Sequence, residues 1–475
     1  MPSRRPHVAA SAAQSELATA LIDLRAKLEL PSWFSRDVLA EADASAASRP
    51  LPELDMSDIE FVTIDPEGST DLDQALHIEP NGTGFRVRYA IADVPALVPP
   101  GGAVDGEARK RGQTLYAPDG RIALHPPAIG DGAGSLLPGR LRGAYVWEFD
   151  LDSDTRQRAV AVRRARVRSR EQLTYAGAQA AVDDGSASET LRLLKIVGQG
   201  RIVLERERGG ASLNAPEEEI VLRDGVYTIE RRLPLAVEDW NAQISLLTGM
   251  AAAELMLAGG VGILRTMPPP SDEAAATFRA QTDALGRPWA LDMPYGEYLR
   301  TLDHDDPFAL AVLQAATTLF RGAGYTVFDG VHPNETMQSA VAAPYAHTTA
   351  PLRRLVDRWC LVICEALSNE KDVPGWARDS LAQLPAIMDA SSRLSSELNA
   401  ASLDRVEAAL LSRRVGEVFS ATVIAIRGDS ARIQLRDPFV TAGCPATPGL
   451  APGSTVRAKL HTVDIATGSI TFSLV

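Results

Sequence analysis

The chain has 475 residues, of which 45% are hydrophobic and 23% charged, and its formal net charge is −13 at pH 7. This composition is typical of a globular protein and excludes a mainly disordered or fibrous one. The negative charge argues against a broad surface for duplex nucleic acid, so a polyanionic partner would have to enter a local basic channel.

No run of the sequence approaches the roughly 18 to 20 consecutive apolar residues of a membrane span, and the polar N-terminus lacks the apolar core of a signal peptide. We therefore expect a cytoplasmic protein that does not bind a membrane. The three cysteines, Cys360, Cys364 and Cys444, are too few for a disulfide framework. We expect them to be small core residues.

The first part of the chain carries one helical pattern and then strand patterns. Residues 13–29 have apolar residues at helical spacing and end before Pro31, which predicts a short helix. Residues 43–58 lack a period and predict a linker. Strand-like alternation follows in three segments: 61–65, 85–94 and 145–152.

Helical patterns dominate the later part, most clearly in residues 191–208, 235–259, 351–368 and 380–412. Strands first and helices second indicate an α+β fold built on a largely antiparallel sheet. After Arg414 the pattern changes to five short strands in about 60 residues. This change predicts a small closed β-barrel of the OB type, with a small β-sandwich as the alternative.

A basic segment lies in residues 155–170. From Arg164 to Arg170 an arginine recurs at every second position, so in a strand these side chains would share one face. Such a face is either a solvated edge or a surface that meets phosphates.

Residues 61–76, FVTIDPEGSTDLDQAL, hold the strongest candidate site. An apolar strand places Asp65 at its end, a turn reverses the chain, and Asp71 and Asp73 then project to the same side if the backbone is extended. Converging carboxylates without cysteine favour a hard cation such as Mg²⁺. Acidic residues are common in turns after strands, so the spacing also fits a turn without metal.

A second polar cluster occupies residues 347–359, HTTAPLRRLVDRW. Pro351 is suited to the first position of a helix, where free N–H groups together with Arg353 and Arg354 would bind an anion. The alternative is that these arginines pair with Asp357 on the helix surface.

Five segments together resemble the successive motifs of the ribonuclease II and ribonuclease R superfamily, and they follow the family's order. They are TIDPEGSTDLDQAL, residues 111–139, SREQLTYAGAQA, VEDWNAQISLL and AHTTAPLRRLVDRW. The resemblance implies a helical segment and linker over 1–57, an α+β RNB catalytic domain over 58–412, and a C-terminal OB-fold RNA-binding barrel over 413–475.

Members of this superfamily are 3′-to-5′ exoribonucleases that hydrolyse single-stranded RNA with Mg²⁺, or with Mn²⁺ in its place, to nucleoside 5′-monophosphates. By motif, Asp65, Asp71 and Asp73 match the first three acidic positions, which bind the metal, and Asp73 is tied most directly to the chemistry. No obligatory protein partner is evident.

The same resemblance assigns residues that would contact the RNA. Arg353 matches the arginine that clamps the phosphate and steadies charge in the transition state, and Arg354 follows it in the motif. Tyr116 matches an aromatic residue that positions the 3′-terminal nucleotides. Glu238 matches an acid near the terminal ribose, where a carboxylate that accepts from the 2′-OH selects RNA over DNA.

The chain departs from the family at three points. The usual fourth acid is Gln74; an amide oxygen can still coordinate a cation, but with one charge fewer we expect weaker Mg²⁺ binding. About 57 residues precede the catalytic region, too few for two cold-shock barrels. Near Leu213 some relatives have a phenylalanine against the terminal bases, and leucine cannot stack in that way.

Two alternative functions compete with that of an active exoribonuclease. Gln74 supports a catalytically weak RNB-domain protein that binds and regulates RNA. The other alternative is an endonuclease or an enzyme that acts on DNA.

Overall fold

The computed structural model describes residues 12–211, 217–223, 226–303, 306–435, 437–438 and 440–475. Its N-terminal part is helical: α1 spans Ala12–Lys27 and α2 spans Arg36–Ser48. The predicted first helix is confirmed. The predicted linker is wrong over 43–48, because Ser35 caps α2 and its alanine-rich sequence continues the helix without a periodic apolar pattern.

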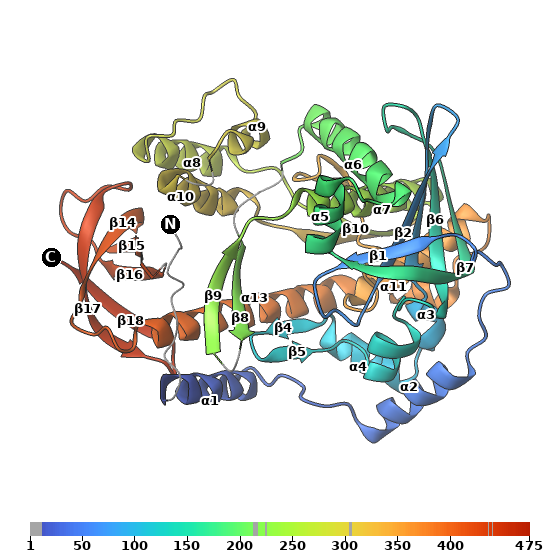
Figure 1. Cartoon of the computed structure of the whole chain (residues 1–475), viewed down its shortest axis with the longest axis horizontal. Helices are drawn as coiled ribbons and strands as arrows, with labels where there is room; N and C mark the ends of the chain where they lie inside the picture. Colours follow the sequence, from blue (N-terminus) through green and yellow to red (C-terminus); the bar gives the residue numbers. More distant parts are fainter. Residues whose placement is uncertain (1–11, 212–216, 224–225, 304–305, 436, 439) are drawn as a thin grey trace.

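The first large sheet of the chain is a closed five-stranded barrel, which lies toward the opposite end of the molecule from the C-terminus (Figure 1). Its strands, in spatial order, are β1 (Phe61–Asp65), β2 (Gln74–Asn81), β3 (Gly84–Ala92), β6 (Leu141–Leu151) and β7 (Gln157–Thr174). Neighbours are antiparallel except for β1 and β7, which pair in parallel and close the barrel. The predicted largely antiparallel sheet is confirmed, and closure leaves this sheet without free edges.

The arginines of β7 alternate with buried side chains as the sequence predicts. Ala165 and Val167 face the core. Arg164 pairs with Asp93 at 2.5 Å, and Arg166 pairs with Asp55 at 2.7 Å. These guanidinium groups therefore hold neighbouring segments against the barrel, and they do not form an open surface for phosphates.

Helices cover the barrel. The main ones are α5 (Tyr175–Asp184), α6 (Glu189–Arg208), α7 (Ala236–Gly259) and α11 (Leu355–Ser368). By length and composition α7 is apolar enough to cross a membrane, but 56% of its apolar window is buried inside the structure. One such helix is weak evidence of a span, and α7 packs in the largest hydrophobic core together with Cys360 and Cys364 of α11.

Shorter elements complete this part of the chain. They are α3 (Val94–Leu97), α4 (Ala103–Arg111), β4 (Leu115–Ala117), β5 (Gly120–Ile122), a π-helical turn (Ala128–Ala133), β8 (Glu217–Arg223), β9 (Val226–Arg232), β10 (Val261–Thr266), α8 (Asp272–Ala284), α9 (Tyr295–Arg300), α10 (Pro307–Ala316), β11 (Gly324–Asp329), β12 (Met337–Gln338), β13 (Ala343–Pro344) and α12 (Gly375–Ser380), with 3₁₀ turns at Thr317–Leu319 and Leu381–Gln383.

The C-terminal part is a second five-stranded barrel. It contains β14 (Val418–Arg427), β15 (Ser430–Leu435), β16 (Thr441–Pro445), β17 (Thr455–Asp464) and β18 (Ser469–Leu474), in the order β16-β15-β14-β17-β18. All four pairs are antiparallel. The outer strands β16 and β18 lie side by side without a ladder between them, so the predicted OB-type barrel is present and nearly closed.

Helix α13 (Leu384–Leu411) connects the two barrels, and α1 packs along it although they are far apart in sequence (Figure 1). Leu17 and Leu21 of α1 share a hydrophobic cluster with Val406 of α13 and Ile465 of the C-terminal barrel. The N-terminal helix therefore helps to fix the C-terminal barrel against the catalytic region.

We expect Leu17→Ala to lower the free energy of unfolding by about 3 kcal/mol, because it removes a fully buried side chain from this cluster. Ile22→Ala on the exposed face of α1 is the control and should change it by less than about 0.5 kcal/mol. Urea unfolding measures both. Equal effects of the two substitutions would contradict the packing of α1 described above.

Candidate active site

The acidic segment forms a turn between β1 and β2. Asp65 is the last residue of β1, Gly68 turns the chain with a φ of 80°, and Asp73 directly precedes β2. The hydroxyl of Ser135 fixes the second half of the turn, because it donates to the carbonyl of Thr70 at 2.7 Å and accepts from the N–H of Leu72 at 2.9 Å. The carboxylates are thus held by a rigid backbone.

Asp65 carries a buried carboxylate oxygen. Its Oδ2 has no hydrogen-bond partner among the described residues. Burial raises the pKa of Asp65 to about 6, the hydroxyl of Thr63 and the charge of Arg353 oppose this rise, and the charge of Asp71 adds to it. A buried oxygen without a donor is a position where a cation would be favourable.

Asp73 is buried as well and has two partners from the distant second cluster. Its Oδ1 accepts from the N–H of Leu352 at 2.7 Å, and its Oδ2 lies 3.8 Å from Nε of Arg353. Burial raises the pKa of Asp73 well above its usual value, although Arg353 and the bond from Leu352 oppose the rise. The structure therefore brings the acidic turn and the second cluster together.

Asp71 is already paired with a cation of the chain. Nη1 of Arg121 lies 2.5 Å from Oδ1 of Asp71, and the same guanidinium bonds Asp131. The sequence analysis assigned no role to Arg121, although it lies within one of the quoted motifs. Its position could not be found from spacing, because Asp71 and Arg121 are 50 residues apart.

The arrangement fits a divalent ion held by few protein ligands. In the part of the chain that the structure describes, no three His, Cys, Asp or Glu side chains are arranged to hold an ion by themselves. Asp65 offers an unpartnered oxygen, and Asp71 lies near enough to influence both Asp65 and Asp73 electrostatically. Mg²⁺ commonly binds to one or two carboxylates and completes its shell with phosphate oxygens and water.

Gln74 is bound at both ends of its amide. Its Nε2 donates to the carbonyl of Thr349 at 2.6 Å, and its Oε1 accepts from the hydroxyl of Tyr89 at 2.8 Å. That hydroxyl also bonds Ser245 at 2.8 Å. The predicted role of Gln74 as a metal ligand stays a prediction, and the hydrogen bonds favour a role in joining β2 to the second cluster.

The predicted helix start at Pro351 is wrong. Residues 351–353 form a turn, Arg354 makes an isolated antiparallel bridge with Gln113, and α11 begins at Leu355. The N–H of Ala350 donates to Oδ1 of Asp357 at 2.7 Å, and the N–H of Leu352 donates to Asp73. The backbone donors that the sequence analysis offered to an external anion are therefore used by carboxylates of the chain.

The two arginines of the second cluster have different surroundings. Arg353 is 46% exposed beside Asp73. Arg354 is buried, and its Nε and Nη2 both bond Asp357, at 2.6 and 2.8 Å. This arrangement matches the alternative in which an arginine pairs with Asp357 and favours a structural role for Arg354, whose RNA contact stays a prediction.

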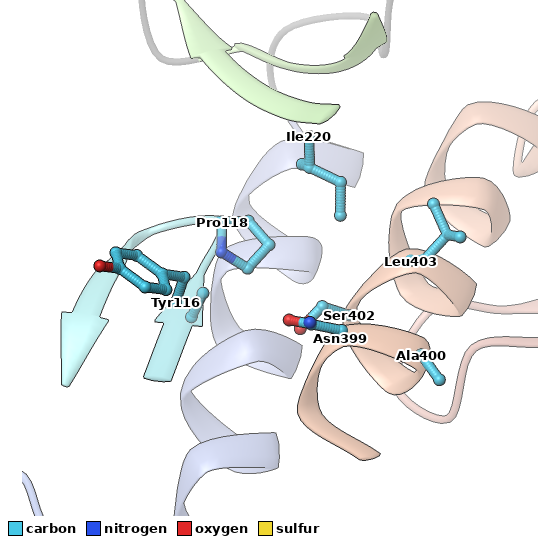
Figure 2. Close-up of a pocket in the computed structure, with 8 residues that line it drawn as sticks. Tyr116, Pro118, Ile220, Asn399, Ala400, Ser402 and Leu403 are labelled. Carbon is cyan, nitrogen blue, oxygen red and sulfur yellow. The ribbon is translucent and has the colours of Figure 1, made fainter. Parts of the chain in front are cut away.

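Tyr116 is half-exposed on β4 at the edge of a cavity of about 560 Å³. Ile220 and residues of α13, such as Asn399 and Leu403, line the other sides, and Figure 2 shows the Tyr116 ring pointing away from α13. Burial raises the pKa of the Tyr116 phenol, and the charge of Asp71 adds to the rise. The ring is thus placed between the cavity and the acidic turn.

Glu238 lies in the first turn of α7, where its Oε1 accepts from the N–H of Leu235 at 2.8 Å and pairs with Arg232. Tyr175, which the sequence analysis did not single out, begins α5 directly after β7. Burial raises the pKa of Tyr175, and the charges of Asp65 and Glu238 add to the rise, so this phenol lies between the two acids. The position of Leu213 lies outside the described residues.

Comparison with known proteins agrees with this geometry. Residues 53–369 match the RNB domain model, and residues 417–475 match the C-terminal S1 domain of RNase II-type exonucleases. The chain belongs to the RNB exoribonuclease family. Divalent-metal dependence is general among exonucleases of this family.

Curated relatives are longer than this chain. Ribonuclease R of Escherichia coli is 27% identical over 422 residues, which cover 82% of this chain and 50% of that protein. The exosome complex exonuclease RRP44 homolog A of Arabidopsis thaliana is 29% identical over 69% of this chain and 37% of that protein. The chain thus spans half or less of these relatives.

Solved structures show the same fold. RNase R of Mycoplasma genitalium in complex with ribose-methylated single-stranded RNA superposes with a TM-score of 0.87 at 18% identity, over 97% of this chain and 78% of that one. Yeast Ssd1, described as a pseudonuclease, superposes with a TM-score of 0.65 at 18% identity, over 84% of this chain and 52% of that one. The fold therefore occurs both in a ribonuclease and in a protein described as a pseudonuclease.

We expect Asp65→Asn to stabilise the metal-free protein at neutral pH. The folded pKa of about 6 exceeds the ordinary 3.8, so ionisation of Asp65 lowers the folding stability between these two values and the full loss is present above them. Unfolding in EDTA should give the variant up to roughly 3 kcal/mol more stability near pH 7.5 and no gain near pH 4. Asp154→Asn, at an exposed position, should be silent at both pH values, and an Asp65→Asn protein that is less stable near pH 7.5 would contradict the burial of this charge.

Gln74→Glu should lower the free energy of unfolding by about 1 to 3 kcal/mol, because a carboxylate cannot donate to the carbonyl of Thr349. Tyr89→Phe, which removes only the hydroxyl on the other side of the amide, should cost less. Chemical unfolding of both variants measures the difference. A more stable Gln74→Glu protein would contradict the bond to Thr349.

Proposed function

We propose that the chain is a hydrolytic 3′-to-5′ exoribonuclease that degrades single-stranded RNA to nucleoside 5′-monophosphates with a divalent ion, preferentially Mg²⁺. The observation that carries this proposal is the exposed Arg353 at 3.8 Å from the buried carboxylate of Asp73. Arg353 also acts electrostatically on Asp65, whose Oδ2 is buried without a partner among the described residues. A cation and carboxylates at one place are suited to a phosphodiester and a divalent ion together.

The proposed role of each residue follows from its surroundings. Asp65 and Asp73 would hold the ion, with Asp71 near them, and the bound ion would polarise the phosphate and lower the pKa of a water molecule. Arg353 would turn toward the scissile phosphate, since among the described residues its one close partner, Asp73, is 3.8 Å away. There it would stabilise the charge that develops in the transition state.

The terminal nucleotides of the RNA would lie between Tyr116, Tyr175 and Glu238. Tyr116 offers an exposed ring for contact with a base or ribose. Glu238 uses Oε1 for the start of α7, and its other oxygen would accept from the 2′-OH of the terminal ribose. This contact would select RNA over DNA.

A second candidate is an RNB-domain protein that binds RNA with little or no hydrolysis. Two observations favour it: Asp71 is paired with Arg121, and both ends of the Gln74 amide are bound within the protein. The fold of yeast Ssd1, a pseudonuclease, is similar.

The deciding experiment uses a single-stranded RNA labelled at its 5′ end and a circular RNA of the same sequence. With Mg²⁺ or Mn²⁺ we expect progressive shortening of the linear RNA, release of nucleoside 5′-monophosphates, and an intact circle. Cleavage of the circle would indicate an endonuclease. Binding of the RNA without shortening at any concentration of either ion would support the second candidate.

Arg353→Ala should lower turnover by about two to three powers of ten with an unchanged melting temperature, because it removes one donor to the transition state from an exposed position. Arg354→Ala is the matched variant with the opposite signature. It leaves the carboxylate of Asp357 buried without its partner, so it should lower the melting temperature strongly. If Arg353→Ala kept its full turnover and Arg354→Ala were folded but inactive, Arg354 would be the arginine that contacts the phosphate and Arg353 would not.

A further inference from the structure

A second cavity lies away from the acidic turn, between α6, α7 and the start of β7. Its volume is about 480 Å³. Asp65 pairs with Thr174 at the end of β7, whereas Gln157 at the start of β7 lines this cavity, so the two sites lie at opposite ends of an 18-residue strand. Along α7, Glu254 at the cavity is about 24 Å from Glu238, at 1.5 Å per residue.

Two arginines of α6, Arg201 and Arg208, line the cavity, and each has buried nitrogens without a hydrogen-bond partner among the described residues. Arg201 is 5% exposed; its Nη1 donates to the carbonyl of Thr155 at 3.3 Å, and its Nε has no partner among the described residues. Arg208 is half-buried, and its Nε and Nη2 are buried without any partner in the described part of the chain. Buried guanidinium nitrogens without acceptors are costly, and an anion would remove this cost.

The charge of the cavity is not balanced by its acids. A third arginine at the cavity, Arg156, already pairs with Glu207 at 2.7 Å. Burial and then the charge of Arg208 lower the pKa of Arg201 to about 10, and Glu254 opposes this only in part. Among the lining residues three arginines face two glutamates, so positive charge predominates in the lining, although the charge of the nearby Glu205 also acts on Arg208.

The remaining lining is apolar and includes Leu204, Leu247 and Met250. A volume of this size accommodates a small organic ligand and exceeds what a bare oxyanion fills. Two guanidinium groups favour a dianion with several acceptor oxygens over a single carboxylate. A ligand of this kind combines a phosphate group with a body that can contact aliphatic side chains.

We propose that this cavity is a binding site for a phosphate monoester of the size of a nucleoside 5′-monophosphate, with Arg201 and Arg208 as its phosphate ligands. The site is separate from the catalytic residues, and its existence does not depend on the hydrolytic activity proposed above.

The test is calorimetric titration of the full chain in EDTA with AMP, adenosine and inorganic phosphate. We expect AMP to bind, adenosine to give no signal, and phosphate to bind more weakly than AMP. Arg208→Gln should weaken AMP binding at least about tenfold, whereas Arg206→Gln, at an exposed position two residues earlier on α6, should leave it within about twofold. Ala343→Leu, which narrows the cavity without a change of charge, should also weaken it.

Arg353→Ala separates this site from the catalytic one, since AMP should bind to this variant as it does to the natural chain. Loss of AMP binding in Arg353→Ala with normal binding in Arg208→Gln would overturn the proposal and place AMP at the acidic turn. Absence of any AMP binding up to about 5 mM would also overturn it. If AMP fails to bind and Arg208→Gln weakens the binding of a single-stranded oligoribonucleotide, the cavity belongs to the path of the RNA and the proposal is wrong.

Discussion

The carboxylate of Asp73 joins two segments of the chain that are 279 residues apart. Its Oδ1 accepts from the N–H of Leu352, and its Oδ2 faces Arg353. The neighbouring Gln74 adds a second connection through the carbonyl of Thr349. These bonds set the acidic turn of the barrel against the turn before α11, so the position of the guanidinium relative to the carboxylates depends on them.

The same arrangement concentrates negative charge where water is excluded. Burial raises the pKa values of Asp65 and Asp73, so the metal-free site favours proton uptake by these carboxylates. Such a site is unfavourable for stability and suited to a divalent ion, which is a common compromise at functional sites. The pair of Asp71 and Arg121, at 2.5 Å, neutralises this carboxylate more closely than Arg353 does Asp73 at 3.8 Å.

The C-terminal barrel depends on packing between distant parts of the chain. The helix α13 leads into it, and α1 from the other end of the chain contacts α13 and the barrel through one hydrophobic cluster. A barrel of this type grips single-stranded nucleic acid by stacking and charge. Under the proposed function, the orientation of this barrel relative to the acidic turn determines whether a bound strand can reach Tyr116.

The sequence by itself determined the fold class, both β-rich regions, most helices and the family. The periodicity of apolar residues shows whether a helix or strand buries one face. Several motifs in the family's order identify the family far more specifically than any single motif does. The linker predicted over 43–48 is a helix instead, because alanine forms helices without an apolar stripe. The helix predicted from Pro351 begins later, because the position of a helix start depends on the partners of its first N–H groups.

Only the tertiary structure decided what each charged residue contacts. From their spacing in the motif, Arg353 and Arg354 were equally suited to bind an anion. In the folded chain Arg353 is exposed beside Asp73, whereas Arg354 packs against Asp357. The tertiary structure likewise assigned Arg121 to Asp71, the arginines of β7 to neighbouring acids, and Arg201 and Arg208 to a shared cavity. The reason is physical: the energy of a charge depends on burial and on partners a few ångströms away, and these come from segments that the linear sequence does not place together.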